Sequence, residues 1–107
     1  VYGASFEGYV IENILTNLPR WKPYFYRTAG GAELDLILVK GTEIIAVEIK
    51  ASTAPNPSRG FWTSCEDIKA TGKYIVGAVD EGYPIKNGAR VCSINELIGL
   101  LSKKDPE

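Results

Sequence analysis

Hydrophobic residues recur at helical spacing near the start of the chain. They lie three or four positions apart, which is typical of the buried side of an amphipathic helix: Phe6, Val10, Ile11, Ile14, Leu15 and Leu18. Ser5 is a suitable N-cap residue, and Pro19 cannot continue a helix. The pattern therefore predicts a helix over residues 5–18 with one side against a core.

Three extended segments follow this helix. Residues 24–27 are rich in aromatic side chains, and residues 43–51 are mostly apolar. In "ELDLILVK" at 33–40, Leu34, Leu36 and Leu38 alternate with the residues between them. The turns between them are short and contain glycine. Strands joined by such turns pair with their neighbours, so the pattern predicts an antiparallel meander.

The rest of the chain alternates between helices and strands. Ser58 can cap a helix, and the apolar run 73–79 predicts a buried strand. Since a helix separates this run from 43–51, the two strands should be parallel. "RVCS" at 90–93 predicts a short edge strand, and "SINE" at 93–96 is a capping box that begins a last helix. The order αβββαβ predicts an α/β fold with a mixed central sheet flanked by helices.

Composition narrows the possible functions. The chain has 107 residues, of which 45% are hydrophobic, and a net charge of −1, which indicates a single packed domain and argues against a strongly electrostatic nucleic-acid binder. The absence of His excludes His-based catalytic pairs and most zinc sites. The two Cys residues form no C-x-x-C motif, so we expect a reduced, cytoplasmic protein. No apolar run approaches the roughly 20 residues of a membrane span, so we expect no membrane partner.

Two charged residues interrupt the third predicted strand. In "IIAVEIKAS", Glu48 and Lys50 are one residue apart and so lie on the same side of a strand. Asp35 on the preceding strand can lie close to Glu48 if the register places both on one face. Adjacent carboxylates repel one another unless a cation such as Mg²⁺ or Mn²⁺ lies between them. A nearby Lys can stabilise a metal-bound hydroxide or the charge that develops on a phosphate.

A simpler interpretation is a surface ion pair between Glu48 and Lys50, which stabilises little. The first helix favours the metal site, because Glu7 falls near the centre of its hydrophobic arc. A buried, unpaired carboxylate there would be costly. A first-turn Glu can also be exposed and interact with the helix dipole. We therefore predict that Glu7, Asp35, Glu48 and Lys50 converge from three elements.

These residues resemble the signature of the PD-(D/E)xK nuclease superfamily, which has a restriction-endonuclease-like αβββαβ core. The matching positions are Glu7 in "FEGYVIE", Asp35 in "ELDLIL", and Glu48 and Lys50 in "VEIKAS"; Leu34 replaces the Pro of the pattern. The resemblance implies a metal site of Glu7, Asp35 and Glu48, to which the Ile49 carbonyl can add a ligand. It implies Asp35, Glu48 and Lys50 as catalytic residues, with Lys50 orienting or stabilising the attacking water.

More narrowly, the chain resembles the C-terminal domain of bacterial and archaeal AAA-type P-loop ATPases. The resemblance runs through "SFEGYVIENIL", "FYRTAGGAELDLIL", "AVEIKAS" and "VCSINELIGLL". It implies that residues 1–107 are one PD-(D/E)xK-like domain from a longer protein with an N-terminal P-loop ATPase domain. The absence of Met and of a phosphate-binding loop fits this expectation.

Three functions remain open at this point. The intact set of acids favours a Mg²⁺-dependent nuclease that hydrolyses DNA or RNA. The near-neutral charge favours a catalytically silent module that docks nucleic acid or protein. A plain structural domain predicts instead that Glu7 is exposed or paired with a basic residue.

Overall fold

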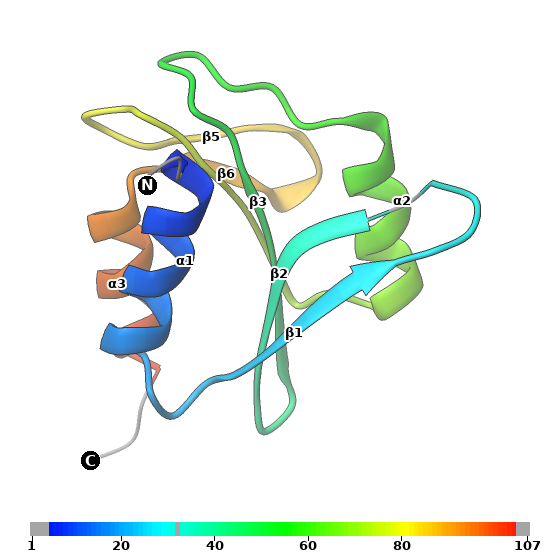
Figure 1. Cartoon of the computed structure of the whole chain (residues 1–107), viewed down its shortest axis with the longest axis horizontal. Helices are drawn as coiled ribbons and strands as arrows, with labels where there is room; N and C mark the ends of the chain where they lie inside the picture. Colours follow the sequence, from blue (N-terminus) through cyan, green and yellow to red (C-terminus); the bar gives the residue numbers. More distant parts are fainter. Residues whose placement is uncertain (1–4, 32, 105–107) are drawn as a thin grey trace.

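The computed structural model describes residues 5–31 and 33–104, and in it a six-stranded sheet lies between helices (Figure 1). The element order begins with one helix, three strands, a helix and a strand, as the sequence predicts. The helices and strands are α1 (Phe6–Asn17), β1 (Lys22–Arg27), β2 (Glu33–Lys40), β3 (Glu43–Ile49), α2 (Arg59–Ile68), β4 (Gly72–Val76), β5 (Tyr83–Pro84), the short 3₁₀ helix η1 (Lys86–Gly88), β6 (Arg90–Cys92) and α3 (Ile94–Ser102). No helix among the described residues is long and apolar enough to span a bilayer.

The sheet is mixed, with strand order β1-β2-β3-β4-β6-β5. β1, β2 and β3 form the predicted antiparallel meander, and β3 and β4 pair in parallel as predicted. The prediction that 90–93 forms an edge strand is wrong, because the segment before it folds back and places β5 outside β6. β3 and β4 also end earlier than predicted, at Ile49 and Val76.

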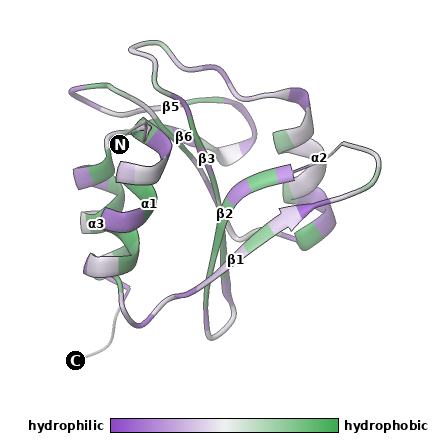
Figure 2. Cartoon of the chain, viewed as in Figure 1, coloured by the Kyte–Doolittle hydropathy of each residue, from purple (hydrophilic) through white to green (hydrophobic). Residues whose placement is uncertain are grey.

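The sheet separates two hydrophobic cores. α1 and α3 cover one face and α2 covers the other (Figure 1), and the central strands β2 and β3 are largely hydrophobic (Figure 2). The fully buried residues of the first core include Val10, Ile14, Leu36, Leu38, Val47, Leu97 and Leu101. The second core includes Ile37, Ala46, Phe61, Cys65, Ile75 and Val91.

Serine side chains fix where the three α-helices begin. Ser5, Ser58 and Ser93 each accept a hydrogen bond from the backbone N–H three residues later, at 3.1, 3.2 and 3.1 Å. The Glu96 carboxylate does not complete the predicted capping box but pairs with the Arg90 guanidinium at 2.7 Å. The cap at Ser58 matters for the site, because it places the start of α2 beside β3.

A β-bulge interrupts β2 at Asp35. Tyr24 opposes Ile37 whereas Tyr26 opposes Leu34, so Asp35 and the following Leu36 together oppose the single residue Phe25. Because of the extra residue, side chains before the bulge lie on the opposite face of the sheet from the one that regular alternation would give them. Leu34 therefore packs in the core beneath α2, while Leu36 packs beneath α1 and α3. The regular alternation that the sequence predicts through Leu34 is wrong at this point.

Candidate metal site

Asp35 is held in place at the bulge. Its Oδ2 accepts a hydrogen bond of 2.8 Å from the backbone N–H of Ile49. The backbone pairing of β2 with β3 ends at Leu36 and Val47, just before Asp35 and Ile49. The side chain of Asp35 thus takes the place of a main-chain acceptor where the two strands part. This contact fixes a half-buried carboxylate at the end of both strands.

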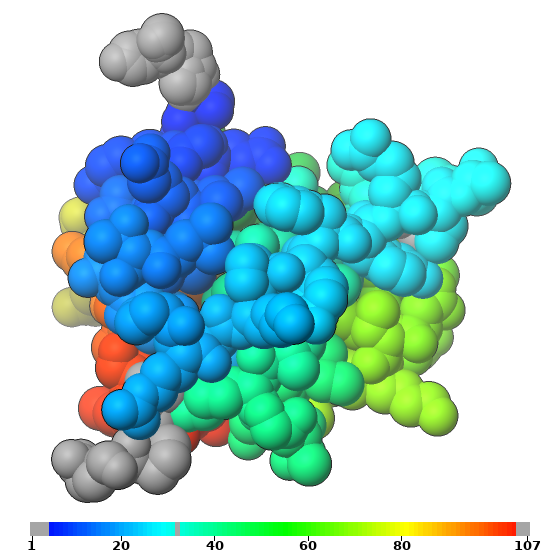
Figure 3. All heavy atoms as spheres, turned by 60° about the horizontal axis from the view of Figure 1, so that its bottom comes forward, coloured from blue at the N-terminus to red at the C-terminus, as the bar shows by residue number. Residues whose placement is uncertain are grey.

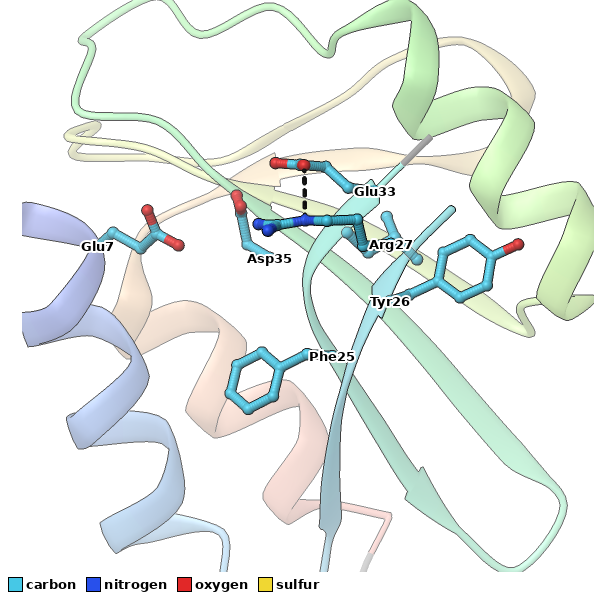
Figure 4. A pocket seen from close by; sticks show the side chains of 7 residues that line it. Glu7, Phe25, Tyr26, Arg27, Glu33 and Asp35 are labelled. Atoms are coloured by element: carbon cyan, nitrogen blue, oxygen red, sulfur yellow. Dashed lines mark ion pairs between the residues drawn. The ribbon is translucent and has the colours of Figure 1, made fainter. Parts of the chain in front are cut away.

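Glu7 approaches Asp35 from α1. In Figure 4 its carboxylate points from the helix toward Asp35. Glu7 shares a helical stripe with Val10 and Ile14, as predicted, but the prediction that it lies against the core is wrong, because it is exposed. The first turn reaches an open cavity at the end of the sheet, while the later turns cover the core. Exposure of Glu7 is also what a plain structural domain predicts.

The surroundings of Glu7 disfavour its negative charge. Although the side chain is exposed, nearby protein displaces enough water to raise the pKa of its carboxyl above 4.5. The negative charges of Asp35 and Glu33 raise the pKa further, as does a side-chain hydrogen bond with Asp35. An additional cation at this place would relieve the repulsion.

Glu48 and Lys50 lie on the α2 side of the sheet. Glu48 shares its side of β3 with Ala46, which packs in the α2 core. Its Oε1 accepts a hydrogen bond of 3.1 Å from the backbone N–H of Ser58, and its Oε2 lies 3.8 Å from the Lys50 Nζ. The Glu48 side chain is only 13% exposed, so this is a partly buried ion pair.

Two cavities meet at Asp35. The first, of about 500 Å³, is lined by Glu7, Phe25, Tyr26, Arg27, Glu33, Leu34 and Asp35 (Figure 4). The second, of about 300 Å³, is lined by Gly31, Glu33, Asp35, Glu48, Ser58 and Gly60. Asp35 therefore lies beside both other predicted acids, but Glu7 and Glu48 line different cavities. Among the described residues, no three His, Cys, Asp or Glu side chains lie close enough together to hold one metal ion.

The predicted ligand Ile49 lies at the end of β3, beside Asp35. Its backbone N–H is used by Asp35, whereas coordination through its carbonyl stays a prediction. Sequence analysis did not identify Phe25 and Ser58 as residues that line or contact the site. Glu33 forms an ion pair with Arg27 at 3.2 Å, which its position opposite Arg27 in the β1–β2 ladder explains.

Comparison with known proteins identifies relatives of this chain. The chain is similar to an uncharacterized protein of Mycobacterium bovis and to one of Mycobacterium tuberculosis, each 29% identical over 108 residues that cover 92% of this chain. It spans about a quarter of their length, since the match covers 24% of each.

The fold is also seen in a chain of the half-complex from a tetradecameric assembly of Thermococcus gammatolerans McrB AAA+ hexamers with bound McrC. That similarity has a TM-score of 0.63 and 16% identity, and it covers 94% of this chain and 32% of the other. Residues 2–97 match the model of the DUF4143 family. The chain therefore belongs to DUF4143, a family of domains of unknown function.

Proposed function

We propose that this domain is a Mg²⁺-dependent nuclease that hydrolyses phosphodiester bonds at Asp35. The observation that carries the proposal is the position of Asp35. Its carboxylate is fixed by the Ile49 N–H at 2.8 Å and lines both cavities, one with Glu7 and one with Glu48. A metal ion and a phosphate can reach such a carboxylate from either cavity.

The residues present fit a hard divalent cation. Mg²⁺ keeps several waters and is usually held by one or two carboxylates together with substrate phosphate oxygens. Asp35 with Glu48, or Asp35 with Glu7, supplies that number, so a group of three acids is not required. Mn²⁺ accepts the same oxygen ligands. Desolvation contributes most to the raised pKa of Glu7, and the further contributions of Asp35 and Glu33 support the proposal, since they come from neighbouring carboxylates.

The ion, when bound, would polarise a phosphoryl oxygen and lower the pKa of a bound water. The protein contributes alignment and charge. Backbone N–H groups of Ile49 and Ser58 hold Asp35 and Glu48 in fixed orientations. Lys50, 3.8 Å from Glu48, places a positive charge where it can stabilise the attacking water or the developing phosphate charge.

We also propose that the domain works beside an AAA-type ATPase domain. A structural neighbour of the same fold comes from an AAA+ assembly with a bound partner, and the curated relatives extend far beyond the matched region. The neighbour shares only 16% identity, so it supports this association through the fold alone.

Calorimetric titration with Mg²⁺ and Mn²⁺ tests the metal site without a known substrate. We expect saturable binding by the wild-type chain and loss of that binding in Asp35→Ala and in Glu48→Ala. Glu12→Gln is the matched control, because Glu12 is an exposed carboxylate on the same helix as Glu7. A wild-type chain that binds no metal at millimolar concentrations, even with an oligonucleotide present, contradicts the proposal.

The second candidate is a docking module without catalysis. It is favoured by the neighbours of Glu48, because Ser58 and Lys50 already compensate its charge. A docking module would bind its partner equally well in Mg²⁺ and in excess EDTA. A nuclease would lose cleavage in EDTA and regain it when Mg²⁺ is restored.

A further inference from the structure

The edge strand β1 carries an aromatic segment between two cations. Its sequence is "KPYFYR", and the side chains are exposed except for the half-buried Tyr26. Tyr26 has a structural role, because its hydroxyl donates a 2.9 Å hydrogen bond to Asp67 on α2. Phe25 next to it is 70% exposed, the largest exposed fraction among the exposed large hydrophobic side chains. An edge position with such a residue is a candidate contact surface.

Phe25 lies on the side of β1 from which Glu7 approaches Asp35. Figure 4 shows that Phe25 and Tyr26 project to opposite sides of the strand, with Phe25 toward α1. Figure 3 shows the cyan segment that contains β1 lying across the molecular surface beside α1. Phe25, Arg27 and Asp35 line one cavity of about 500 Å³. An apolar ring, a guanidinium and the proposed metal-binding carboxylate are thus accessible to one ligand.

We propose that Phe25 stacks on an unpaired base of a single-stranded nucleic-acid substrate, while the adjoining phosphate lies at Asp35. This inference rests on the proposed nuclease function and adds a substrate class to it. Aromatic side chains bind single strands by stacking on bases of any sequence, whereas in a duplex the base faces are stacked on one another. Arg27, whose side chain is 80% exposed, can contact a neighbouring backbone phosphate.

The charge of the cavity adds a condition to this binding. Among the described residues of the lining, Glu7, Glu33 and Asp35 contribute three carboxylates, and Arg27 contributes one guanidinium. A phosphate is repelled from such a cavity until a divalent cation compensates the acids. We therefore expect single-strand binding to require Mg²⁺, although salt usually weakens the binding of nucleic acids.

Fluorescence anisotropy tests the inference with a labelled oligodeoxythymidylate of about 12 nucleotides, a length typical of single-strand sites. A hairpin duplex is the competing probe, and gel electrophoresis determines whether either probe is cleaved, so that affinities are read before cleavage begins. We expect Phe25→Ala to weaken single-strand binding in Mg²⁺ by about tenfold or more. Phe25→Trp should preserve binding, and calorimetric Mg²⁺ binding should be unchanged in both variants.

Tyr24→Ala is the matched control. Tyr24 is the preceding residue on β1, is 45% exposed, and opposes Ile37 on the α2 side of the sheet. It is not among the described residues that line the cavity. Its replacement should leave single-strand affinity within about twofold of wild type. A loss equal to that of Phe25→Ala would overturn the assignment of the stacking role to Phe25.

The other outcomes separate this inference from the nuclease proposal. Saturable Mg²⁺ binding together with equal affinity for hairpin and single strand overturns the stacking role and leaves the nuclease proposal standing. Phe25-dependent single-strand binding in EDTA, with no metal binding, supports the stacking role but overturns both its expected Mg²⁺ requirement and the nuclease proposal. Phe25-dependent binding of an oligoarginine peptide, with no oligonucleotide binding, overturns the inference in favour of a basic protein partner.

Discussion

The two cavities that meet at Asp35 differ in how the protein treats their second carboxylate. On the α2 side, Glu48 accepts a hydrogen bond from Ser58 and lies 3.8 Å from the Lys50 ammonium. On the α1 side, desolvation raises the pKa of Glu7 most, and the negative charges of Asp35 and Glu33 raise it further. The negative charge of Glu48 is therefore already compensated by its neighbours. A cation beside Glu7 would reduce the repulsion between carboxylates there. The comparison teaches that two glutamates that each line a cavity with Asp35 can differ in their partners: Glu48 has a hydrogen-bond donor and a cation beside it, whereas Glu7 lies beside other carboxylates.

Substitutions of Asp35 should have the largest effect, since both cavities depend on it. Asp35→Ala removes the acceptor of the Ile49 N–H and should destabilise the fold by about 1–3 kcal/mol. Asp35→Asn keeps a carbonyl acceptor at the same place, so stability should stay within about 1 kcal/mol of wild type while metal binding is lost. Urea denaturation and calorimetric titration measure the two effects. Equal stability of Asp35→Ala and wild type would show that the contact with Ile49 does not hold the strands.

The repulsion at Glu7 should make the stability of the protein depend on pH. Because the folded protein raises the pKa of Glu7 above 4.5, protonated Glu7 favours folding, and this contribution is full below that pH. This contribution to stability is lost as the pH rises through the raised pKa of Glu7. Glu7→Gln should therefore stabilise the protein near pH 7, by less than about 1 kcal/mol because the side chain is exposed to solvent. At pH 4 the gain should disappear.

Urea denaturation at both pH values measures this difference, with Glu12→Gln as the control on the same helix. A gain of equal size at pH 4 and pH 7 would exclude charge repulsion as its cause. Addition of Mg²⁺ sharpens the comparison. If Glu7 is a ligand, Mg²⁺ should stabilise wild type more than Glu7→Gln.

Local patterns in the sequence were sufficient for most of the fold. Ser5, Ser58 and Ser93 begin helices as predicted because capping depends on a few adjacent residues. The short turns lead to the antiparallel meander, and the intervening helix leads to the parallel pair, because connection length limits how two strands can pair. β6 is an inner strand because the two-residue strand β5, just before it in the chain, pairs along its outer side, and so short a strand leaves no periodic pattern in the sequence.

The candidate site was predictable only where strand side chains alternate regularly between the two faces of the sheet. Glu48 and Lys50 lie on one side of the sheet because strand side chains alternate. The bulge at Asp35 escaped prediction, because Leu34, Leu36 and Leu38 fit a regular strand in the sequence. The exposure of Phe25 also escaped it, since an aromatic residue in a strand is usually packed and only the edge position leaves this one open.

The smallest expected effect is a change in the rate at which a thiol reagent labels Cys65. This rate distinguishes which of the two cavities a metal ion occupies. Burial raises the pKa of the Cys65 thiol to about 11; the positive charge of Lys73 lowers it somewhat, and the negative charge of Glu48 raises it. Burial likewise raises the pKa of Cys92 to about 12, and there Glu96 and Arg90 are the acting charges. Both thiols should therefore react slowly with a disulfide reagent at pH 8, because they are buried and because the thiolate is the reactive form.

Glu48→Gln should speed labelling of Cys65 by roughly twofold, the effect of removing one partly screened charge, and should leave Cys92 unchanged as an internal control. Mg²⁺ bound by Glu48 would compensate the same charge and should speed Cys65 labelling in wild type but not in Glu48→Gln. Mg²⁺ bound only on the α1 side would stabilise the protein through Glu7 and slow both thiols alike, leaving the ratio of the Cys65 rate to the Cys92 rate unchanged. Mass spectrometry of the labelled chain, with and without Mg²⁺, therefore determines whether the preorganised carboxylate or the uncompensated one binds the ion.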